Sequence, residues 1–186
     1  MTPAGLLEVE NPSSLFISDS TNSGSAIVSV IEGSRPLLVE VQALTSPTFF
    51  NYPQRVATGI DYKRLSMLLA VLERRVGMSV HGVDCFVNVV GGIKVFETSS
   101  DLGIILAIAS SIKNIPIAKG TVVIGEVGLG GEVRPVYGIK NRLKEAENMG
   151  CKVAIVPQKN SDAKTKKIDI IGVENVPQAV ENTMGS

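Results

Sequence analysis

Few side chains in this sequence suit covalent or metal chemistry. His81 is the single histidine. The sequence therefore cannot supply both a Ser-His-Asp triad and a separate histidine ligand, nor a histidine-rich zinc site, and the cysteines form no CxxC pair. His81 and Cys85 fit one face of a strand, but no third group orients them, which favours an exposed turn residue beside a core thiol. Cys85 and Cys151 each lie in an apolar run, which indicates buried free thiols in a reducing compartment. Metal binding is therefore not expected.

Asp101 is a carboxylate with two interpretations. It opens an apolar segment of helical periodicity, where an acid in the first turn stabilises the positive end of the helix dipole by roughly 0.3–1 kcal/mol. Thr98 and Asp101 also match a capping box, and hydroxyl groups such as those of Ser99 and Ser100 are common where helices begin. Helix capping alone accounts for these residues, so a catalytic interpretation needs a second motif.

The glycine-rich run GEVGLGGEV, residues 125–133, has the composition of an anion-binding loop. Glycines allow backbone N–H groups to approach a phosphate, but this run lacks the Gly-Lys-Ser/Thr ending of a nucleotide-binding loop. Short strand-like segments flank its glycines, as in a β-hairpin. We therefore predict a hairpin turn here and no cofactor-binding site in this sequence.

The elements that must position these residues alternate between two hydrophobic periods. Apolar patterns bounded by turn residues predict β-strands at residues 25–30, 37–44, 83–90, 93–96, 121–127, 132–136, 152–156 and 168–173. A period near 3.6 residues, or an apolar run of helical length, predicts helices at residues 62–76, 102–112 and 139–149 and from residue 176 onward. This order of elements predicts an α+β fold.

Turn chemistry joins these elements. The first two strands form a hairpin over turn residues 32–36. The first long helix begins at a capping box of Thr58 and Asp61 and ends at Gly77. Gly91-Gly92 is predicted to form either a tight hairpin turn or a bulge, with a strand on each side.

Composition restricts the class of protein. The 186 residues are 44% hydrophobic and 19% charged, which is the composition of one compact domain, with or without a small appendage. Lys plus Arg equals Asp plus Glu at 18 each, so nucleic acid or an anionic membrane would have to meet a local basic patch. The first residues, MTPAGLLEVENPS, match no targeting signal, and no apolar run is long enough to span a membrane. A soluble, cytoplasmic protein without membrane contact is expected.

Residues 125–157, GEVGLGGEVRPVYGIKNRLKEAENMGCKVAIVP, resemble the end of the proteolytic domain of Lon. Glycines, strand and helix recur there in the same order, and Asp101-Leu102-Gly103 aligns with the Ser-Ala-Gly that begins a helix in Lon. The resemblance implies a Lon protease-like domain of S5 domain 2-like architecture. In that family the serine attacks the peptide and a lysine of the following helix activates it. The corresponding residues here, called the dyad positions below, are Asp101 and Arg142.

Both changes remove the chemistry of the dyad. A carboxylate is a poor acyl acceptor, and a guanidinium with a pKa above about 12 is not a neutral base. Arg142 could instead pair with Asp101. Ser99 and Ser100 are expected to act in helix capping rather than as substitute nucleophiles. No catalytic residue is predicted, and serine-type proteolysis is the least favoured alternative.

A longer set of motifs extends the resemblance to nearly the whole chain. GLLEVENPSSLF, RPLLVEVQALTSPT, RVATGIDYKRLSMLLAVLERRVG, VNVVGGIKV and VIGEVGLGGEVR are similar, in this order, to the C-terminal domain of the bacterial RadA family, also called Sms. That family implies a DNA repair and recombination protein, a DNA-dependent ATPase in which a zinc motif and a RecA-like ATPase domain precede a Lon-like domain. Residues 1–17 are then the expected junction with the ATPase domain, and residues 18–186 the Lon protease-like domain. ATP, Mg²⁺ and Zn²⁺ are implied only for the preceding parts, whose motifs this sequence lacks.

The RadA resemblance also implies that this domain binds double-stranded or branched DNA. Such contacts are expected from Lys or Arg side chains on rigid turns, which meet phosphates without reading sequence. Arg35, Lys94 and Arg134 follow three predicted glycine turns and are expected to converge on one surface. Lys63 and Arg64, at the start of the first long helix, extend it. The alternative for each residue is a solvated surface charge.

A pure assembly module is the competing hypothesis. The neutral net charge favours it, and the DNA contacts would then belong to the ATPase domain. Phe49-Phe50-Asn51-Tyr52 is an apolar, aromatic loop suited to self-association, unless it folds over the core. The family also implies a hexameric ring of subunits, with a RecA-type recombinase as a further partner.

Overall fold

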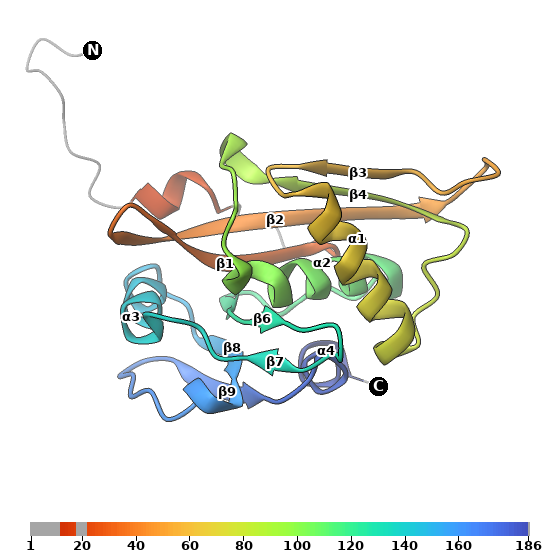
Figure 1. Cartoon of the computed structure of the whole chain (residues 1–186). Helices are drawn as coiled ribbons and strands as arrows, with labels where there is room; N and C mark the ends of the chain where they lie inside the picture. Colours follow the sequence, from red (N-terminus) through yellow and green to blue (C-terminus); the bar gives the residue numbers. More distant parts are fainter. Residues whose placement is uncertain (1–11, 18–21, 186) are drawn as a thin grey trace, which may run out of the picture.

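The fold is mixed, with strands and helices that follow one another along the chain (Figure 1). The computed structural model describes residues 12–17 and 22–185. Its strands are β1 (Ser25–Glu32), β2 (Arg35–Pro47), β3 (Arg55–Thr58), β4 (Val83–Val89), β5 (Thr121–Val123), β6 (Glu126–Val127), β7 (Val133–Arg134), β8 (Val153–Pro157) and β9 (Asp169–Val173). Its α-helices are α1 (Tyr62–Val71), α2 (Asp101–Lys113), α3 (Ile139–Asn148) and α4 (Val176–Met184).

Seven strands form one sheet in the order β3-β4-β2-β1-β5-β8-β9. The pairs β1–β2 and β2–β4 are antiparallel, whereas β3–β4, β1–β5, β5–β8 and β8–β9 are parallel. A parallel pair needs a crossover connection, and α3 supplies one between β5 and β8. The short strands β6 and β7 form a separate hairpin. The α+β class predicted from the sequence is confirmed.

Helices cover both faces of the sheet. Val28 and Val39 belong to the core cluster that includes α1, α2 and α4, whereas Leu38 and Leu143 belong to the cluster beneath α3. The opposite assignment of the adjacent residues Leu38 and Val39 follows from the two-residue period of a strand. Helix α2 is buried from Asp101 to Ser110, which matches its apolar sequence.

Several turns form as the sequence predicts. The β1–β2 hairpin is present, and Gly77 ends the first long helix in the left-handed conformation with φ 77°. Between α1 and Gly77 the helix continues as a π-helical turn, Leu72–Val76. Gly150, with φ 78°, follows the end of α3. Glycine adopts these dihedrals without the steric cost that a Cβ atom imposes.

The predicted strand at residues 93–96 is wrong. After β4 the chain makes a 3-10 turn at Val90–Gly92, in which Gly91 and Gly92 have φ values of 77° and 71°. The Val95 N–H then donates to the Gly59 carbonyl at 2.7 Å instead of joining a ladder with β4. The two glycines therefore redirect the chain toward α2, and the hairpin and bulge predictions both fail.

The predicted capping boxes are also wrong in part. Asp61 caps α1 without Thr58, because its carboxylate accepts from the Arg64 N–H at 2.9 Å. Thr98 does not cap α2, since its hydroxyl donates to Glu126 Oε2 at 2.8 Å. Residues Thr98–Ser100 instead form a 3-10 turn that leads directly into α2.

Both cysteines are buried free thiols, as the sequence predicts. Burial raises the pKa of the Cys85 thiol to about 11 and also raises the pKa of Cys151. Both side chains therefore remain protonated and unreactive near neutral pH.

The expected junction at residues 1–17 lies largely outside the described residues. Within it, the buried Ser13 donates from its hydroxyl to Glu145 Oε1 of α3 at 2.7 Å and accepts from the Leu38 N–H of β2 at 3.1 Å. Residues 12–17 therefore lie against the domain. Among the helices described, none is long and apolar enough to cross a membrane.

Candidate functional site

The two dyad positions lie near the carboxyl ends of the parallel strands β1 and β5. The Leu102 N–H at the start of α2 donates to the Gly125 carbonyl at 3.0 Å, and the Gly125 N–H donates back to Ser99 at 2.8 Å. From α3, Arg142 reaches the Ser29 carbonyl of β1 at 2.6 Å. This end of an open α/β sheet is where ligands usually bind.

Asp101 is held in a buried ion pair with Arg64. Its side chain is 1% exposed, and both carboxylate oxygens accept hydrogen bonds from the Arg64 guanidinium, with Nε at 2.8 Å from Oδ1. The Val127 N–H adds a hydrogen bond to Oδ2 at 3.2 Å, and Arg64 donates to the Val127 carbonyl at 3.0 Å. The pair therefore joins α1, α2 and β6.

The electrostatics of this pair reflect its burial. Burial raises the pKa of the Asp101 carboxyl, although hydrogen bonds from Arg64 and Val127 oppose that rise. The hydrogen bond with Asp101 raises the pKa of Arg64. The carboxylate is thus occupied by a cation and a backbone donor, and its lone pairs are not directed at a substrate.

Arg142 is the largest fully buried side chain among the described residues. Its guanidinium donates to the Tyr137 carbonyl at 3.0 Å, to the Ser29 carbonyl at 2.6 Å and to the Ser99 hydroxyl at 3.2 Å. Its fourth partner is the carboxylate of Glu97, with which it forms an ion pair. Three neutral oxygens and one carboxylate therefore replace the water that this cation loses.

The expected pair between Arg142 and Asp101 does not form. Each residue has its own partner, Glu97 for Arg142 and Arg64 for Asp101. Sequence reasoning missed Glu97, which lies in an irregular segment without a recognisable motif. The signal for Arg64 was available, because it lies four residues before the buried Leu68 on the same helical face.

Ser99 and Ser100 have different roles from the expected capping. The Ser99 hydroxyl is buried, donates to the Ser29 carbonyl at 3.2 Å and accepts from Arg142. The Ser100 hydroxyl donates to the Glu97 carbonyl at 2.8 Å, and no side chain caps α2. Ser99 therefore contacts a guanidinium, which cannot remove its proton.

One of the predicted DNA-binding residues, Lys94, lines a small hollow, and a second, Arg35, lies next to this hollow in the β1–β2 hairpin. Glu32, at the end of β1, pairs across the hairpin with Arg35 and lines a hollow together with Lys94 and Phe96. The Arg35 and Lys94 side chains are both exposed. The structure thus brings these two cations to the same end of the sheet.

The other predicted contacts are arranged along the neighbouring segments. Arg134 forms ion pairs with Glu132 and Glu126, and Glu126 accepts from Thr98, four residues after Lys94. Lys63 is exposed at the start of α1. Arg64, by contrast, is directed into its pair with Asp101, so its charge is already neutralised.

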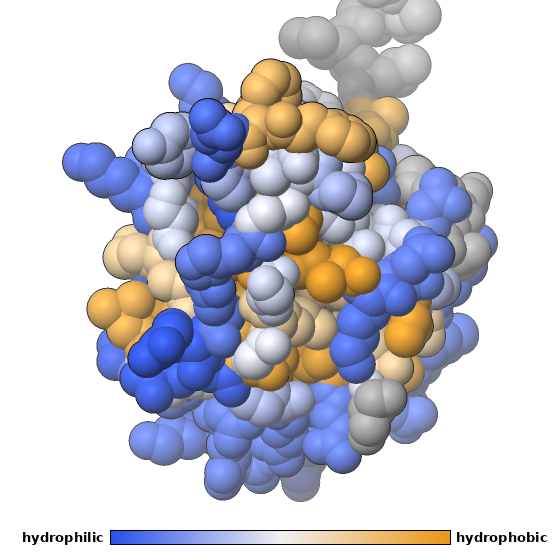
Figure 2. All heavy atoms as spheres, turned by 90° about the vertical axis from the view of Figure 1, so that its right-hand side faces the viewer, coloured by the Kyte–Doolittle hydropathy of each residue, from blue (hydrophilic) through white to orange (hydrophobic). Residues whose placement is uncertain are grey.

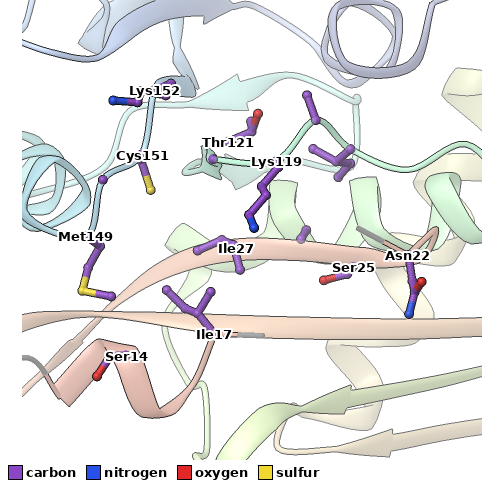
Figure 3. A pocket seen from close by; sticks show the side chains of 15 residues that line it. Ser14, Ile17, Asn22, Ser25, Ile27, Lys119, Thr121, Met149, Cys151 and Lys152 are labelled. Carbon is purple, nitrogen blue, oxygen red and sulfur yellow. The ribbon is translucent and has the colours of Figure 1, made fainter. Parts of the chain in front are cut away.

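A second hollow, of about 500 Å³, lies at the opposite end of the sheet. Ser25, Thr121 and Lys152, at or just before the starts of β1, β5 and β8, line it. Figure 3 shows Lys119 and Cys151 pointing into it. This hollow is remote from the dyad positions and is not a remnant of a protease site.

No group of three or more His, Cys, Asp or Glu side chains suited to a metal ion occurs among the residues described.

The aromatic loop between β2 and β3 projects into solvent. Phe49, Phe50 and Tyr52 are 92%, 62% and 85% exposed, so the loop does not fold over the core. The loop lies at the right of Figure 1 and faces the viewer in Figure 2, where hydrophobic residues gather near the top of the molecule.

Comparison with known proteins places this site in a family. The family model described as subunit ChlI of Mg-chelatase matches residues 66–160, just over half of the chain and both dyad positions. The chain therefore belongs to that family. Over its full length it is 49% identical to the DNA repair protein RadA of Halalkalibacterium halodurans and 47% identical to that of Bacillus subtilis. It is 48% identical to RadA of Escherichia coli over 97% of the chain.

These relatives are longer proteins. The chain covers 41%, 41% and 40% of their respective lengths, in their C-terminal part. The resemblance to the C-terminal domain of RadA, first suggested by the motifs, is confirmed.

Proposed function

We propose that this domain is a non-catalytic, DNA-binding and ring-forming module of a RadA-type DNA repair and recombination protein. The observation that carries the proposal is the double neutralisation of the dyad positions. Asp101 and Arg142 are each buried in a separate ion pair, with Arg64 and Glu97 as partners. A protease needs a nucleophile beside a base, and this arrangement offers two charged groups that are already bound to other residues.

A peptide-hydrolysis assay tests the non-catalytic part. The wild-type chain is expected to leave an unstructured peptide intact. The double variant Asp101→Ser, Arg142→Lys restores the residue types of the dyad and serves as the matched comparison. Hydrolysis by the wild-type chain, with loss in Ser99→Ala, would instead make Ser99 a nucleophile and overturn this part.

Exposed cations at the carboxyl end of the sheet support the DNA-binding part. Lys94 lines a small hollow and Arg35 pairs in the β1–β2 hairpin with Glu32, which lines the same hollow, so both cations suit phosphate contacts that do not depend on base sequence. Lys63 extends this set of exposed cations, whereas the Arg64 guanidinium is already paired with Asp101. Arg134 would exchange its carboxylate partners for phosphates. Double-stranded and branched DNA are the proposed ligands.

A salt-dependent titration of labelled duplex DNA tests this binding. The variant Arg35→Glu, Lys94→Glu is expected to bind more weakly, and the slope of log affinity against log salt should fall by roughly 0.9 for each phosphate that the variant no longer neutralises. Lys152→Glu is the control, because Lys152 is exposed at the opposite end of the sheet. An equal loss of affinity per reversed charge in both variants would show that only net charge matters.

Assembly without DNA contact is the second candidate, favoured by the exposed aromatic loop at residues 49–52. Aromatic side chains that stay in solvent in one subunit are suited to burial between subunits. Sedimentation of the chain and of Phe49→Ser, Tyr52→Ser compares their masses in solution. A lower mass for the variant supports assembly through this loop. A RecA-type recombinase partner and a hexameric ring stay predictions from the family resemblance, and a cytoplasmic location stays a prediction from the sequence.

A further inference from the structure

Phe96 and Tyr137 are large side chains left in solvent beside the dyad positions. They are 84% and 89% exposed. One buried guanidinium contacts both segments, because Arg142 donates to the Tyr137 carbonyl at 3.0 Å and to the side chain of Glu97, the residue after Phe96. The two aromatic residues therefore lie on segments that the same side chain holds.

The Phe96 side chain is kept outward by the residues on either side of it. Val95 is buried, and its N–H donates to the Gly59 carbonyl at 2.7 Å. Glu97 accepts from the Ile31 N–H at 2.8 Å in addition to its pair with Arg142. Alternate residues of an extended segment face opposite sides, so Lys94 and Phe96 share the exposed side.

The Tyr137 backbone is fixed in a similar way. The preceding Val136 N–H donates to Asn160 Oδ1 at 2.9 Å, and the Tyr137 carbonyl accepts from Arg142. Gly138, with φ 71°, then begins α3, whose first turn contains the exposed Lys140. Each aromatic side chain thus has an exposed lysine two or three residues away.

We propose that Phe96 and Tyr137 form a stacking platform for unpaired bases of single-stranded DNA, with Lys94 and Lys140 beside them for the phosphates. This proposal rests on the proposed DNA-binding function and names the strand state that this end of the domain recognises. Base stacking on exposed aromatic side chains, combined with nearby cations, is how proteins bind single strands without sequence preference. A protein partner fits less well, because lysine is depleted in protein interfaces.

The platform and the predicted duplex contacts bind different parts of DNA, base faces in one case and phosphates in the other. Bases in a duplex are stacked on one another, and their faces are closed to a protein side chain. Phosphates are accessible in both forms of DNA. Loss of an aromatic side chain at this site should therefore weaken binding of a single strand and leave duplex binding unchanged.

Fluorescence anisotropy with labelled oligothymidylate measures this effect. Phe96→Ala and Tyr137→Ala are each expected to lower the affinity about fivefold or more. The salt dependence should stay as in the wild type, since neither side chain carries charge. Leu44→Ala is the control, because it removes a large apolar side chain that is 64% exposed on β2 and belongs to none of the proposed surfaces.

A spectroscopic test uses the absence of tryptophan from the sequence. Phe96→Trp introduces a single indole, whose fluorescence should be quenched when a thymine stacks on it. Leu44→Trp places the same reporter on an exposed position of β2 and should not respond.

The outcomes separate this proposal from the proposed function. Unchanged oligothymidylate affinity in Phe96→Ala and Tyr137→Ala, together with unquenched Phe96→Trp, overturns the platform. If Arg35→Glu, Lys94→Glu still loses duplex binding in that case, the proposed function stands alone. A wild-type chain that binds neither duplex nor oligothymidylate overturns both.

Discussion

The two dyad positions accommodate buried charge in opposite ways. At position 101 a buried acid meets a cation that is 26% exposed, whereas at position 142 a buried cation meets an acid that is 36% exposed. Beyond its ionic partner, Asp101 has one backbone N–H, from Val127, while Arg142 has three neutral oxygens. The comparison indicates that Asp101 depends on Arg64 far more than Arg142 depends on Glu97.

The largest effect is expected from removal of the buried cation itself. Arg142→Ala removes one donor each from the Tyr137 and Ser29 carbonyls, the Ser99 hydroxyl and the Glu97 carboxylate, and opens a cavity beneath α3. Because the Glu97 charge left behind is partly exposed, the cost comes mainly from the lost side-chain volume and hydrogen bonds, and about 3–5 kcal/mol of unfolding free energy is expected. Urea denaturation measures it. Arg142→Lys retains the charge with fewer donors, so its stability should fall between those of the wild type and Arg142→Ala. An unchanged denaturation midpoint in Arg142→Ala would contradict the partners described for position 142.

Most of the elements of this fold could be predicted from the sequence, because their signals are local. The hairpin β1–β2 follows from strand periodicity around turn residues, and Gly77 and Gly150 end their helices through dihedrals that glycine favours. Residues 93–96 mark the limit of such signals. They alternate between buried and exposed like a strand, but an extended segment has the same period whether or not a neighbouring strand pairs with it.

The sequence allowed the residues at the dyad positions to be predicted, but not their ion-pair partners. The family resemblance singled out Asp101 and Arg142, and in the structure both are buried charges at one end of the sheet. Their partners, Arg64 and Glu97, lie 37 and 45 residues away in the sequence, so no local pattern pairs them. Arg64 lies on the buried face of its helix, which indicates an internal partner, but its positive charge favoured the prediction of a DNA contact instead.

The next largest effect should come from the outer partner at position 101. Arg64→Gln removes the cation and leaves the Asp101 carboxylate buried with one backbone donor. Because hydrogen bonds to charged groups contribute about 1.5–3 kcal/mol, a loss of that size is expected in urea denaturation at neutral pH. Lys63→Gln is the matched control, since Lys63 is the adjacent exposed cation on α1. A loss no greater than that of the control would contradict the role given to Arg64.

The pH dependence of stability should sharpen the same comparison. Burial raises the pKa of Asp101 in the folded protein, so the folded state holds this proton at pH values where the unfolded state has released it. The free energy of unfolding then falls as pH rises from the pKa of this carboxyl in the unfolded state, about 3.9, through its raised pKa in the folded state. Arg64→Gln removes a hydrogen bond that lowers the pKa, which should extend this window to higher pH.

Denaturation across a pH series measures the extended window. Asp101→Asn in the Arg64→Gln background removes the titrating group and should abolish the additional pH dependence. If the double variant keeps it, another carboxylate is responsible.

The smallest effect is expected from the outer partner at position 142. Glu97→Gln removes the negative charge but keeps an oxygen that can accept from the Ile31 N–H or from Arg142. The three neutral oxygens around Arg142 remain, and the negative charge removed was partly solvent-exposed, so a cost of about 1 kcal/mol or less is expected. The same urea titration as for Arg64→Gln gives the direct comparison. A loss in Glu97→Gln as large as that in Arg64→Gln would show that carbonyl and hydroxyl oxygens do not replace an ionic partner here, and that both dyad positions depend equally on their outer residues.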